Sequence, residues 1–189
     1  MKDAEVRWTM AGKLKMRLRK NVGIILVTLL MVLVLDGATK NMAVEHLTAG
    51  HVPREVWGEV VRFTLIYNTG AAMGLPLGPY SRPIVVVASL VVIGVLLNIA
   101  RKSPTSGKTF YVALGLLLGG AVGNLIDRIF SPRGVVDFID IGIGAVRFWT
   151  FNVADIGITC GALFLAVVLW REEKQTAREN LQEQNGSNP

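Results

Sequence analysis

VGIILVTLLMVLVL, at residues 22–35, is an apolar run typical of a helix inside a membrane. A weaker apolar stretch continues it through Met42 and Val44, so it reaches the length of about 20 residues that a helix needs to cross the hydrocarbon core. Three further runs follow, at residues 83–100, 110–129 and 153–170. Hydrophobic residues make up 51% of the chain and charged residues 18%, which is too apolar for an ordinary soluble domain. The sequence therefore predicts four transmembrane helices in a single domain over residues 1–189.

The start of the chain also fits a second interpretation, because a basic region followed by an apolar run is the pattern of a signal peptide. No small-x-small cleavage pattern follows the run directly, and three further apolar runs remain downstream. We therefore interpret the first run as a membrane span.

The basic residues predict the orientation of the spans. Lysines and arginines gather in residues 1–20, in the link at 101–108 and in the tail at 171–189, which all lie on one side if the spans alternate. We expect both termini in the cytoplasm and the tail at residues 171–189 to fray. The net charge of +6 then reflects topology and anionic lipid headgroups. Nucleic acid is not an expected partner, because no aromatic-basic recognition pattern accompanies the basic residues.

The two outer segments have the composition of β-strands. Residues 60–67 are rich in β-branched and aromatic residues and stop at Asn68-Thr69-Gly70, as a strand entering a turn does. Residues 135–140 and 145–151 suggest two more strands. The expected fold is thus an all-α membrane protein with a small β-sheet on its outer surface. For residues 45–60, which include Val56 and Trp57, we expect an amphipathic lid at the interface.

Small residues in the third run indicate close helix packing. Gly115, Gly119 and Gly123 recur every four residues, which lets a neighbouring helix approach. Cys160 lies inside the fourth run and cannot form an internal disulfide, because the chain contains one cysteine. We interpret Cys160 as a small apolar residue of the packing.

Polar side chains occur where the membrane makes them costly, and such residues are functional candidates by default. Most stand at the outer ends of the predicted spans, and one stands in the outer strand between the third and fourth spans. They are Asp36, Lys40, Asn124, Asp127, Arg128, Asn152 and Asp155 in the spans or directly before them, and Asp137 in the strand. A proton-coupled transporter would place its carboxylates near the midplane instead.

Several of these residues also have a structural interpretation. Asp36 and Lys40 have the spacing of an ion pair within one helix. Asn124, Asp127 and Arg128 share a helix face, where an arginine can neutralise a carboxylate and still donate hydrogen bonds. Asn152 fits the N-cap of the fourth helix and Asp155 its third position, where the helix dipole favours a negative charge. Capping does not exclude catalysis.

Asp137 is the hardest of the carboxylates to explain structurally. Its sequence neighbours are apolar and no cation is adjacent, so burial should raise its pKa. Asp140 falls on the opposite face of the strand, and we interpret it as structural. One carboxylate in an apolar setting and one at a helix N-terminus favour different protonation states. Acid-base catalysis on a carbonyl requires this difference.

These polar residues and Asn68 lie in five segments: DGATK at 36–40, NTGAA at 68–72, GGAVGNLIDR at 119–128, GVVDFID at 134–140 and FNVAD at 151–155. Together they resemble the bacterial lipoprotein signal peptidase (signal peptidase II) family. Each alone is weak, but they occur in order and match the four-helix layout of the family. Met73-Gly74 and Ile156 depart from residues common in the family, which affects substrate preference rather than reaction class.

The resemblance implies an aspartic endopeptidase that removes signal peptides from diacylglyceryl-modified prolipoproteins, just before the lipidated cysteine of the lipobox. It implies Asp137 and Asp155 as the catalytic pair near the outer face of the bacterial inner membrane, with no metal and no organic cofactor. Asn68, Asn124, Arg128 and Asn152 would bind substrate or orient the pair. Asp36 and Lys40 would support the structure, as would Asp127 together with Arg128, although a catalytic Asp127 is the nearest rival.

The expected partners are the prolipoprotein substrates and membrane lipids, and we expect a monomer. The alternative function is a small proton-coupled transporter that uses Asp36, Asp127 and Asp155. Against it, the four spans show no internal repeat and no Gly/Pro-broken segment at mid-depth.

Overall fold

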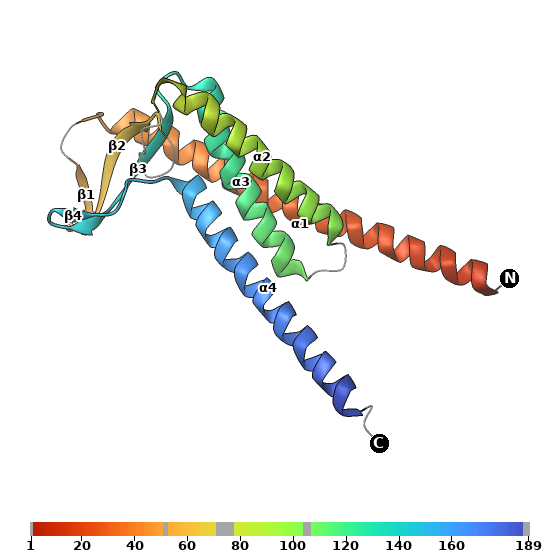
Figure 1. Ribbon diagram of the computed structural model, residues 1–189. Coiled ribbons are helices and arrows are strands. Elements are labelled where there is room, and N and C mark those ends of the chain that lie inside the picture. Colours follow the sequence, from red (N-terminus) through yellow and green to blue (C-terminus); the bar gives the residue numbers. More distant parts are fainter. Residues whose placement is uncertain (1, 51–52, 71–77, 104–106, 187–189) are drawn as a thin grey trace.

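A bundle of four long helices carries a small β-sheet at one end (Figure 1). The structure is a computed structural model that describes the backbone of residues 2–50, 53–70, 78–103 and 107–186. Side chains are described over the same ranges except for residues 2–19, 79 and 183–186. The basic side chains before Lys20 and residues 71–74 of the motifs discussed above lie outside the described part.

The predicted spans all form helices, and each helix extends beyond its apolar run. They are α1 (Lys2–His46), α2 (Ser81–Lys102), α3 (Lys108–Phe130) and α4 (Val153–Gly186), with a short 3-10 turn, η2 (Gly78–Tyr80), before α2. The stretches long and apolar enough to cross a membrane are Lys20–His46, Ser81–Lys102, Lys108–Phe130 and Val153–Gln182. Both termini lie at the end of the molecule away from the sheet (Figure 1).

The expectation of a frayed tail is wrong for most of its length, because α4 continues to Gly186. Residues 171–182 are mainly Arg, Glu, Lys, Gln, Leu and Ala, which are strong helix formers, and the first glycine of the tail is Gly186. Charge alone therefore does not end this helix.

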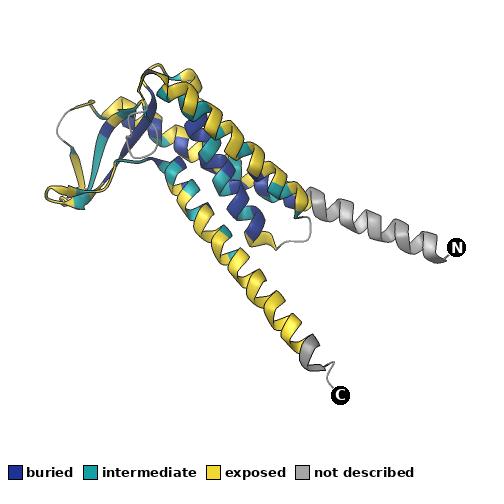
Figure 2. Cartoon of the chain, in the orientation of Figure 1, coloured by how far each residue is buried: buried dark blue, intermediate teal, exposed yellow. Residues whose placement is uncertain are grey.

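Helix α3 lies at the centre of the bundle. In its apolar window 61% of the residues are buried, compared with 22% or less in the other three spans. Figure 2 shows this contrast, with buried residues along α3 and exposed residues along most of α4. The outward side chains of α1, α2 and α4 are mostly Leu, Val, Ile and Phe, as expected for surfaces that face lipid tails.

The predicted close packing at the glycines of α3 is confirmed. A Cβ at Gly115 would lie 2.6 Å from Cβ of Thr28, and one at Gly119 would lie 2.8 Å from Cβ of Val32. Gly123 faces the Asp36 side chain, which a Cβ would approach to 2.9 Å. These glycines thus let α1 lie directly against α3.

The sheet is antiparallel, with strand order β1-β2-β3-β4 among the described residues. Its strands are β1 (Arg54–Trp57), β2 (Val61–Asn68), β3 (Val135–Ile143) and β4 (Val146–Arg147). Strands β2 and β3 confirm two predicted strands to within a few residues. The third predicted strand, at 145–151, is shorter than expected, because β4 covers Val146–Arg147. Beyond it, the Phe148 backbone donates to the Ile141 carbonyl at 2.8 Å, and Phe151 forms a bridge with Ile139.

Strand β1 was not predicted, because the segment 45–60 was expected to form a lid. That segment instead finishes α1 and then pairs Arg54 and Glu55 with Phe63 and Arg62 of β2. Val56 and Trp57 are largely exposed. The sequence signal of β1 is weak because the strand has four residues, two of them charged.

Candidate functional site

The predicted site residues meet where the bundle joins the sheet. The C-terminal ends of α1 and α3, the N-terminus of α4 and strands β2 and β3 all reach this region (Figure 1). Here Asp36, Lys40, Asn124, Asp137 and Asn152 are buried, whereas Asp127, Arg128 and Asp155 are partly buried. The structure therefore gathers side chains from segments that are more than a hundred residues apart in sequence.

Asp137 is the third residue of β3 and is 4% exposed. The Asn68 amide donates to its Oδ2 at 3.0 Å, and the Asn152 amide donates to its Oδ1 at 2.7 Å. Burial raises the pKa of Asp137 to about 6, and the negative charge of Asp155 adds to the rise. The hydrogen bonds from the two asparagine amides lower this pKa, but they do not cancel the effect of burial. The predicted rise in the pKa of Asp137 is confirmed.

Asp155 and Asn152 cap the N-terminus of α4 as predicted. Asn152 precedes the first helical residue, and its Oδ1 accepts from the Asp155 backbone N–H at 3.0 Å. In return, Oδ2 of Asp155 accepts from the Asn152 backbone N–H at 3.1 Å. This reciprocal pair fixes both side chains at the positive end of the helix dipole.

Asn124 of α3 connects the two carboxylates through Asn152. Its Nδ2 donates to Oδ1 of Asp155 at 2.8 Å, and its Oδ1 accepts from Nδ2 of Asn152 at 3.1 Å. The same Nδ2 of Asn152 donates to Asp137. Two asparagines therefore bridge Asp137 and Asp155, and each carboxylate keeps a defined orientation.

Lys40 determines which way the Asn124 amide faces. Its Nζ donates to Oδ1 of Asn124 at 3.2 Å and forms ion pairs with Asp36 at 2.7 Å and Asp127 at 2.8 Å. An ammonium group only donates hydrogen bonds, so the oxygen of Asn124 must face Lys40 and its NH₂ must face Asp155. The predicted pair of Asp36 and Lys40 is confirmed, and the bond to Asn124 extends it to the site.

Asp36 also supports α4 directly. Its Oδ1 accepts from the backbone N–H of Ala154 at 2.8 Å, which is one of the N–H groups in the first turn that lack a partner within the helix. Asp36 therefore ties the end of α1 to the residue next to Asp155.

Asp127 is placed differently from the prediction. We expected it to support the structure together with Arg128, but its ion pair is with Lys40, and its Oδ2 also accepts from the Val136 backbone N–H at 3.4 Å. Arg128 instead donates to the backbone carbonyl of Asn124 at 3.1 Å. It lies close enough to interact electrostatically with Asp155, Asp137 and Asp127.

Asp140 lies in a separate charged cluster. It forms ion pairs with Arg147 at 2.6 Å and Arg62 at 3.1 Å, which join β3 to β4 and β2. Burial alone would raise the pKa of Asp140, but the two arginines outweigh it and hold that pKa below its ordinary value. The structural role predicted for Asp140 agrees with these contacts.

A cleft of about 500 Å³ opens beside Asp137. Its lining comes from the end of β2, the start of α2 and the segment before α4. The residues are Ile66, Tyr67, Asn68, Thr69, Gly70, Gly78, Ser81, Asp137, Trp149 and Thr150. A smaller hollow of about 50 Å³ lies next to Asn68 and is lined by Arg82 and Arg128. The buried carboxylate therefore has access to a space large enough for a peptide segment.

Sequence reasoning missed two residues that line these spaces: Arg82 in the smaller hollow and Trp149 in the cleft. Arg82 donates from Nε and Nη2 to the carbonyls of Arg128 and Ile129, at 2.5 and 3.0 Å, and so satisfies the end of α3. Trp149 lines the cleft from the segment that was predicted to be a regular strand. The aromatic pair Phe148-Trp149 was a usable signal, because aromatic side chains gather at membrane interfaces.

Comparison with a family of known proteins gives a match over most of the chain. A family described as signal peptidase (SPase) II matches residues 28–171. This range contains every predicted site residue.

Curated relatives agree with the family match. A lipoprotein signal peptidase of Anoxybacillus flavithermus is 38% identical over 146 residues, which are 77% of this chain and 84% of that protein. The lipoprotein signal peptidase of Chlorobium phaeobacteroides is 38% identical, over 74% of this chain and 90% of that protein. That of Rhodococcus jostii is 39% identical, over 73% of this chain and 68% of that protein.

Solved structures of bacterial membrane enzymes share the fold. One, described as a bacterial membrane enzyme structure at 2.3 Å resolution, superposes with a TM-score of 0.73 at 28% identity and covers 82% of this chain and 92% of its own. A second, at 1.9 Å resolution, gives a TM-score of 0.69 at 29% identity and covers 78% and 93%. The fold with four apolar helices and a small sheet is thus that of known membrane enzymes.

Proposed function

Because this chain belongs to the signal peptidase II family, whose members remove signal peptides from prolipoproteins, we propose that Asp137 and Asp155 are its catalytic pair. The protein is a bacterial multi-pass membrane peptidase. The proposal adds an aspartic mechanism, with cleavage directly before the diacylglyceryl-modified cysteine of the lipobox.

The observation that carries the proposal is the bridge of two asparagines between the carboxylates. Asn152 donates to Asp137, and Asn124 donates to Asp155, while the two amides are themselves hydrogen bonded at 3.1 Å. Asp137 also borders the cleft of about 500 Å³. A catalytic pair of aspartates that shares one proton requires two fixed carboxylates in different environments, next to a space for substrate.

In the proposed reaction, Asp155 is the base and Asp137 the acid. The helix N-terminus favours the anionic form of Asp155, and burial favours the protonated form of Asp137. Asp155 takes a proton from water, whose oxygen attacks the scissile carbonyl carbon, while Asp137 gives its proton to the carbonyl oxygen. The carbon–nitrogen bond then breaks as the cysteine nitrogen gains a proton from Asp155, and one hydroxyl of the intermediate returns a proton to Asp137, which leaves a carboxylic acid and restores both aspartates.

The remaining polar residues hold the pair or the substrate. Asn68 and Arg128 border the hollows beside Asp137, where each can donate to a peptide carbonyl. Asn124 and Asn152 orient the carboxylates, and Lys40 orients Asn124. In this assignment Asp127 supports Lys40 and does not contact the substrate.

We further propose that the sheet end of the molecule faces the outer side of the membrane and that both termini are cytoplasmic. The end of α2, the start of α3 and the C-terminal part of α4 carry basic residues, and all three lie away from the sheet (Figure 1). The acyl chains of the substrate can then stay in lipid while its peptide reaches the cleft. The comparisons give the transporter alternative no support.

The test of this function is a cleavage assay on a purified prolipoprotein, with the enzyme in lipid and without added metal. The products should be the free signal peptide and a mature protein that begins with the lipidated cysteine, both identified by mass. An otherwise identical substrate without the diacylglyceryl group should be cleaved much more slowly. Equal cleavage of both substrates, or a cut at another bond, would contradict the proposed specificity.

A further inference from the structure

A second cavity lies on the face of the sheet opposite the cleft. This groove of about 410 Å³ runs between the end of α1 and strands β1 and β2, and it shares no lining residue with the cleft. Phe138 lines the groove, while its neighbour Asp137 borders the cleft, because successive side chains of a strand point to opposite faces. The groove is therefore separate from the proposed catalytic pair.

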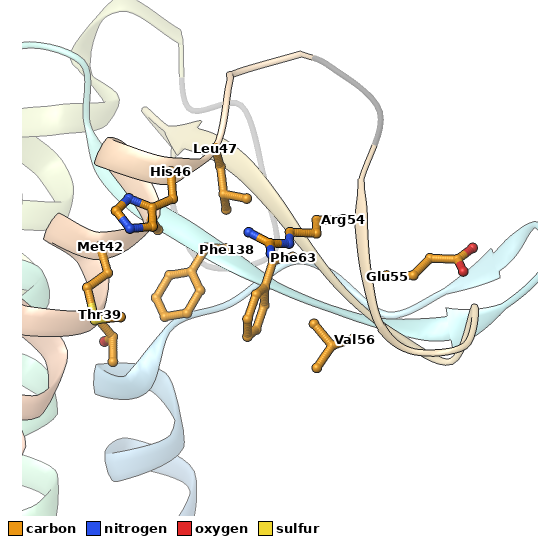
Figure 3. A pocket seen from close by; sticks show the side chains of 10 residues that line it. Thr39, Met42, His46, Leu47, Arg54, Glu55, Val56, Phe63 and Phe138 are labelled. Atoms are coloured by element: carbon orange, nitrogen blue, oxygen red, sulfur yellow. The ribbon is translucent and has the colours of Figure 1, made fainter.

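The walls of the groove are apolar. Phe63 and Phe138 pack edge to face with their centroids 5.9 Å apart, and Met42, Leu47 and Val56 complete the walls (Figure 3). Met42 is 59% exposed and Val56 is 55% exposed, so the described part of the chain leaves this surface open. An acyl chain would cover such a surface favourably.

Two nitrogen-bearing side chains lie at one end of the groove. His46 and Arg54 reach toward it from α1 and β1, whereas the Glu55 carboxylate points away (Figure 3). Within the described ranges, the Arg54 guanidinium has no hydrogen bond or ion pair with another residue. This cation is available for an external anion, and a guanidinium matches the oxygens of a phosphate in particular.

The groove has its polar end and its apolar end arranged along α1 in the same order as the headgroup and acyl chain of a membrane lipid. His46 is the last residue of α1 and of its membrane-spanning stretch, while Thr39 lies seven residues, or about 10 Å, further into that span. The cationic end thus lies at headgroup depth and the apolar end points toward the hydrocarbon. A lipid seated there would have its phosphate on the outside and its acyl chain inside.

We propose that this groove binds an anionic phospholipid of the membrane, with its phosphate on Arg54 and His46 and an acyl chain against Met42, Phe63 and Phe138. The diacylglyceryl group of the substrate is uncharged and gives Arg54 no counterion. A phospholipid with a net negative charge does. The bound lipid would connect the end of α1 to the sheet that carries Asn68 and Asp137.

Photocrosslinking tests the site directly. Benzoylphenylalanine is placed at Met42 or at Val56, on the two sides of the groove, and the full-length protein is put into vesicles of phosphatidylglycerol and phosphatidylcholine with matched acyl chains. The control position is Met31, which is 51% exposed and lies about three turns from Met42 on the same side of α1. Mass spectrometry then identifies the attached lipid.

We expect phosphatidylglycerol to be enriched about fivefold at Met42 and Val56 relative to Met31. This factor corresponds to the attraction of about 1 kcal/mol between one basic residue and an anionic lipid. Arg54→Gln should remove the enrichment. Arg133→Gln, which takes the same charge from another exposed arginine at this end of the molecule, should keep it. The lipid readout does not depend on cleavage, so it separates this site from the proposed function.

Three outcomes would overturn the proposal. The first is equal lipid composition at Met42, Val56 and Met31. The second is enrichment that persists in Arg54→Gln. The third is attachment of added prolipoprotein, in place of phospholipid, at both groove positions, which would assign the groove to the substrate.

Discussion

Replacing Gly120 with alanine should inactivate the enzyme although Gly120 has no side chain in the site. A Cβ at this position would lie 2.2 Å from the carbonyl oxygen of Ala154 and 2.7 Å from Cγ1 of Ile158. Ala154 is in the first turn of α4, next to Asp155, and it is anchored by Asp36. The new methyl group would therefore push on the part of α4 that carries Asp155 of the proposed catalytic pair.

The distances give the size of the effect. A carbon and a carbonyl oxygen approach to about 3.3 Å at the closest, so α3 and α4 must separate by about 1 Å at this crossing. Overpacking of this kind costs about 1–3 kcal/mol of stability, from which up to about 1 kcal/mol is recovered because alanine favours a helix over glycine. A displacement of about 1 Å at the reacting groups reduces turnover by about 100-fold.

Prolipoprotein cleavage and unfolding in detergent measure the two effects. The matched control is Gly94→Ala in α2, because a Cβ at Gly94 would have nothing within 4 Å. This control should keep full activity and gain up to about 1 kcal/mol. If Gly120→Ala retains activity within a factor of two of the unmodified enzyme, the link between this helix crossing and the catalytic pair is refuted.

Two further predictions concern buried charge. Lys40→Met leaves Asp36 and Asp127 without their shared cation and should cost about 3–5 kcal/mol in detergent unfolding. Lys102→Met, on the exposed surface of α2, should cost less than about 0.5 kcal/mol. An equal loss of stability in the two variants would contradict the stabilising role of the Lys40 ion pairs. Because burial raises the pKa of Asp137 to about 6 and the protonated form donates in the reaction, kcat/KM should fall as pH rises through that value. A value of kcat/KM that increases through pH 6 would reverse the assigned acid and base roles. The raised pKa also contributes to folding stability: this contribution is fully present below the ordinary carboxyl pKa and is lost as pH rises through about 6.

The sequence predicted the helices and most of the site because both follow from local rules. The apolar runs had the length of membrane spans, and the order Asn152-Val-Ala-Asp155 fits a reciprocal cap that needs no distant partner. The rise in the pKa of Asp137 followed from its apolar neighbours in the strand. For each of these features, the residues that decide the outcome are adjacent in sequence.

The missed features depend on distant contacts. Asp127 pairs with Lys40 across 87 positions rather than with its neighbour Arg128, because α1 and α3 are brought together at the glycines of α3. Strand β1 is held by its pairing with β2, and its own four residues carry little strand preference. Helix spacing shows which side chains share a face, but it does not show which helix lies opposite that face.

The most direct test of the catalytic assignment compares three single substitutions in the prolipoprotein cleavage assay, each with a check of folding. Asp137→Asn and Asp155→Asn keep the size of each side chain and one accepting oxygen but remove the ionisable group. Asp127→Asn is the control, because its carbonyl oxygen can still accept from Lys40. The account predicts no detectable cleavage by the first two proteins and measurable cleavage by the third. A folded Asp127→Asn protein without activity, together with an active Asp137→Asn protein, would contradict it.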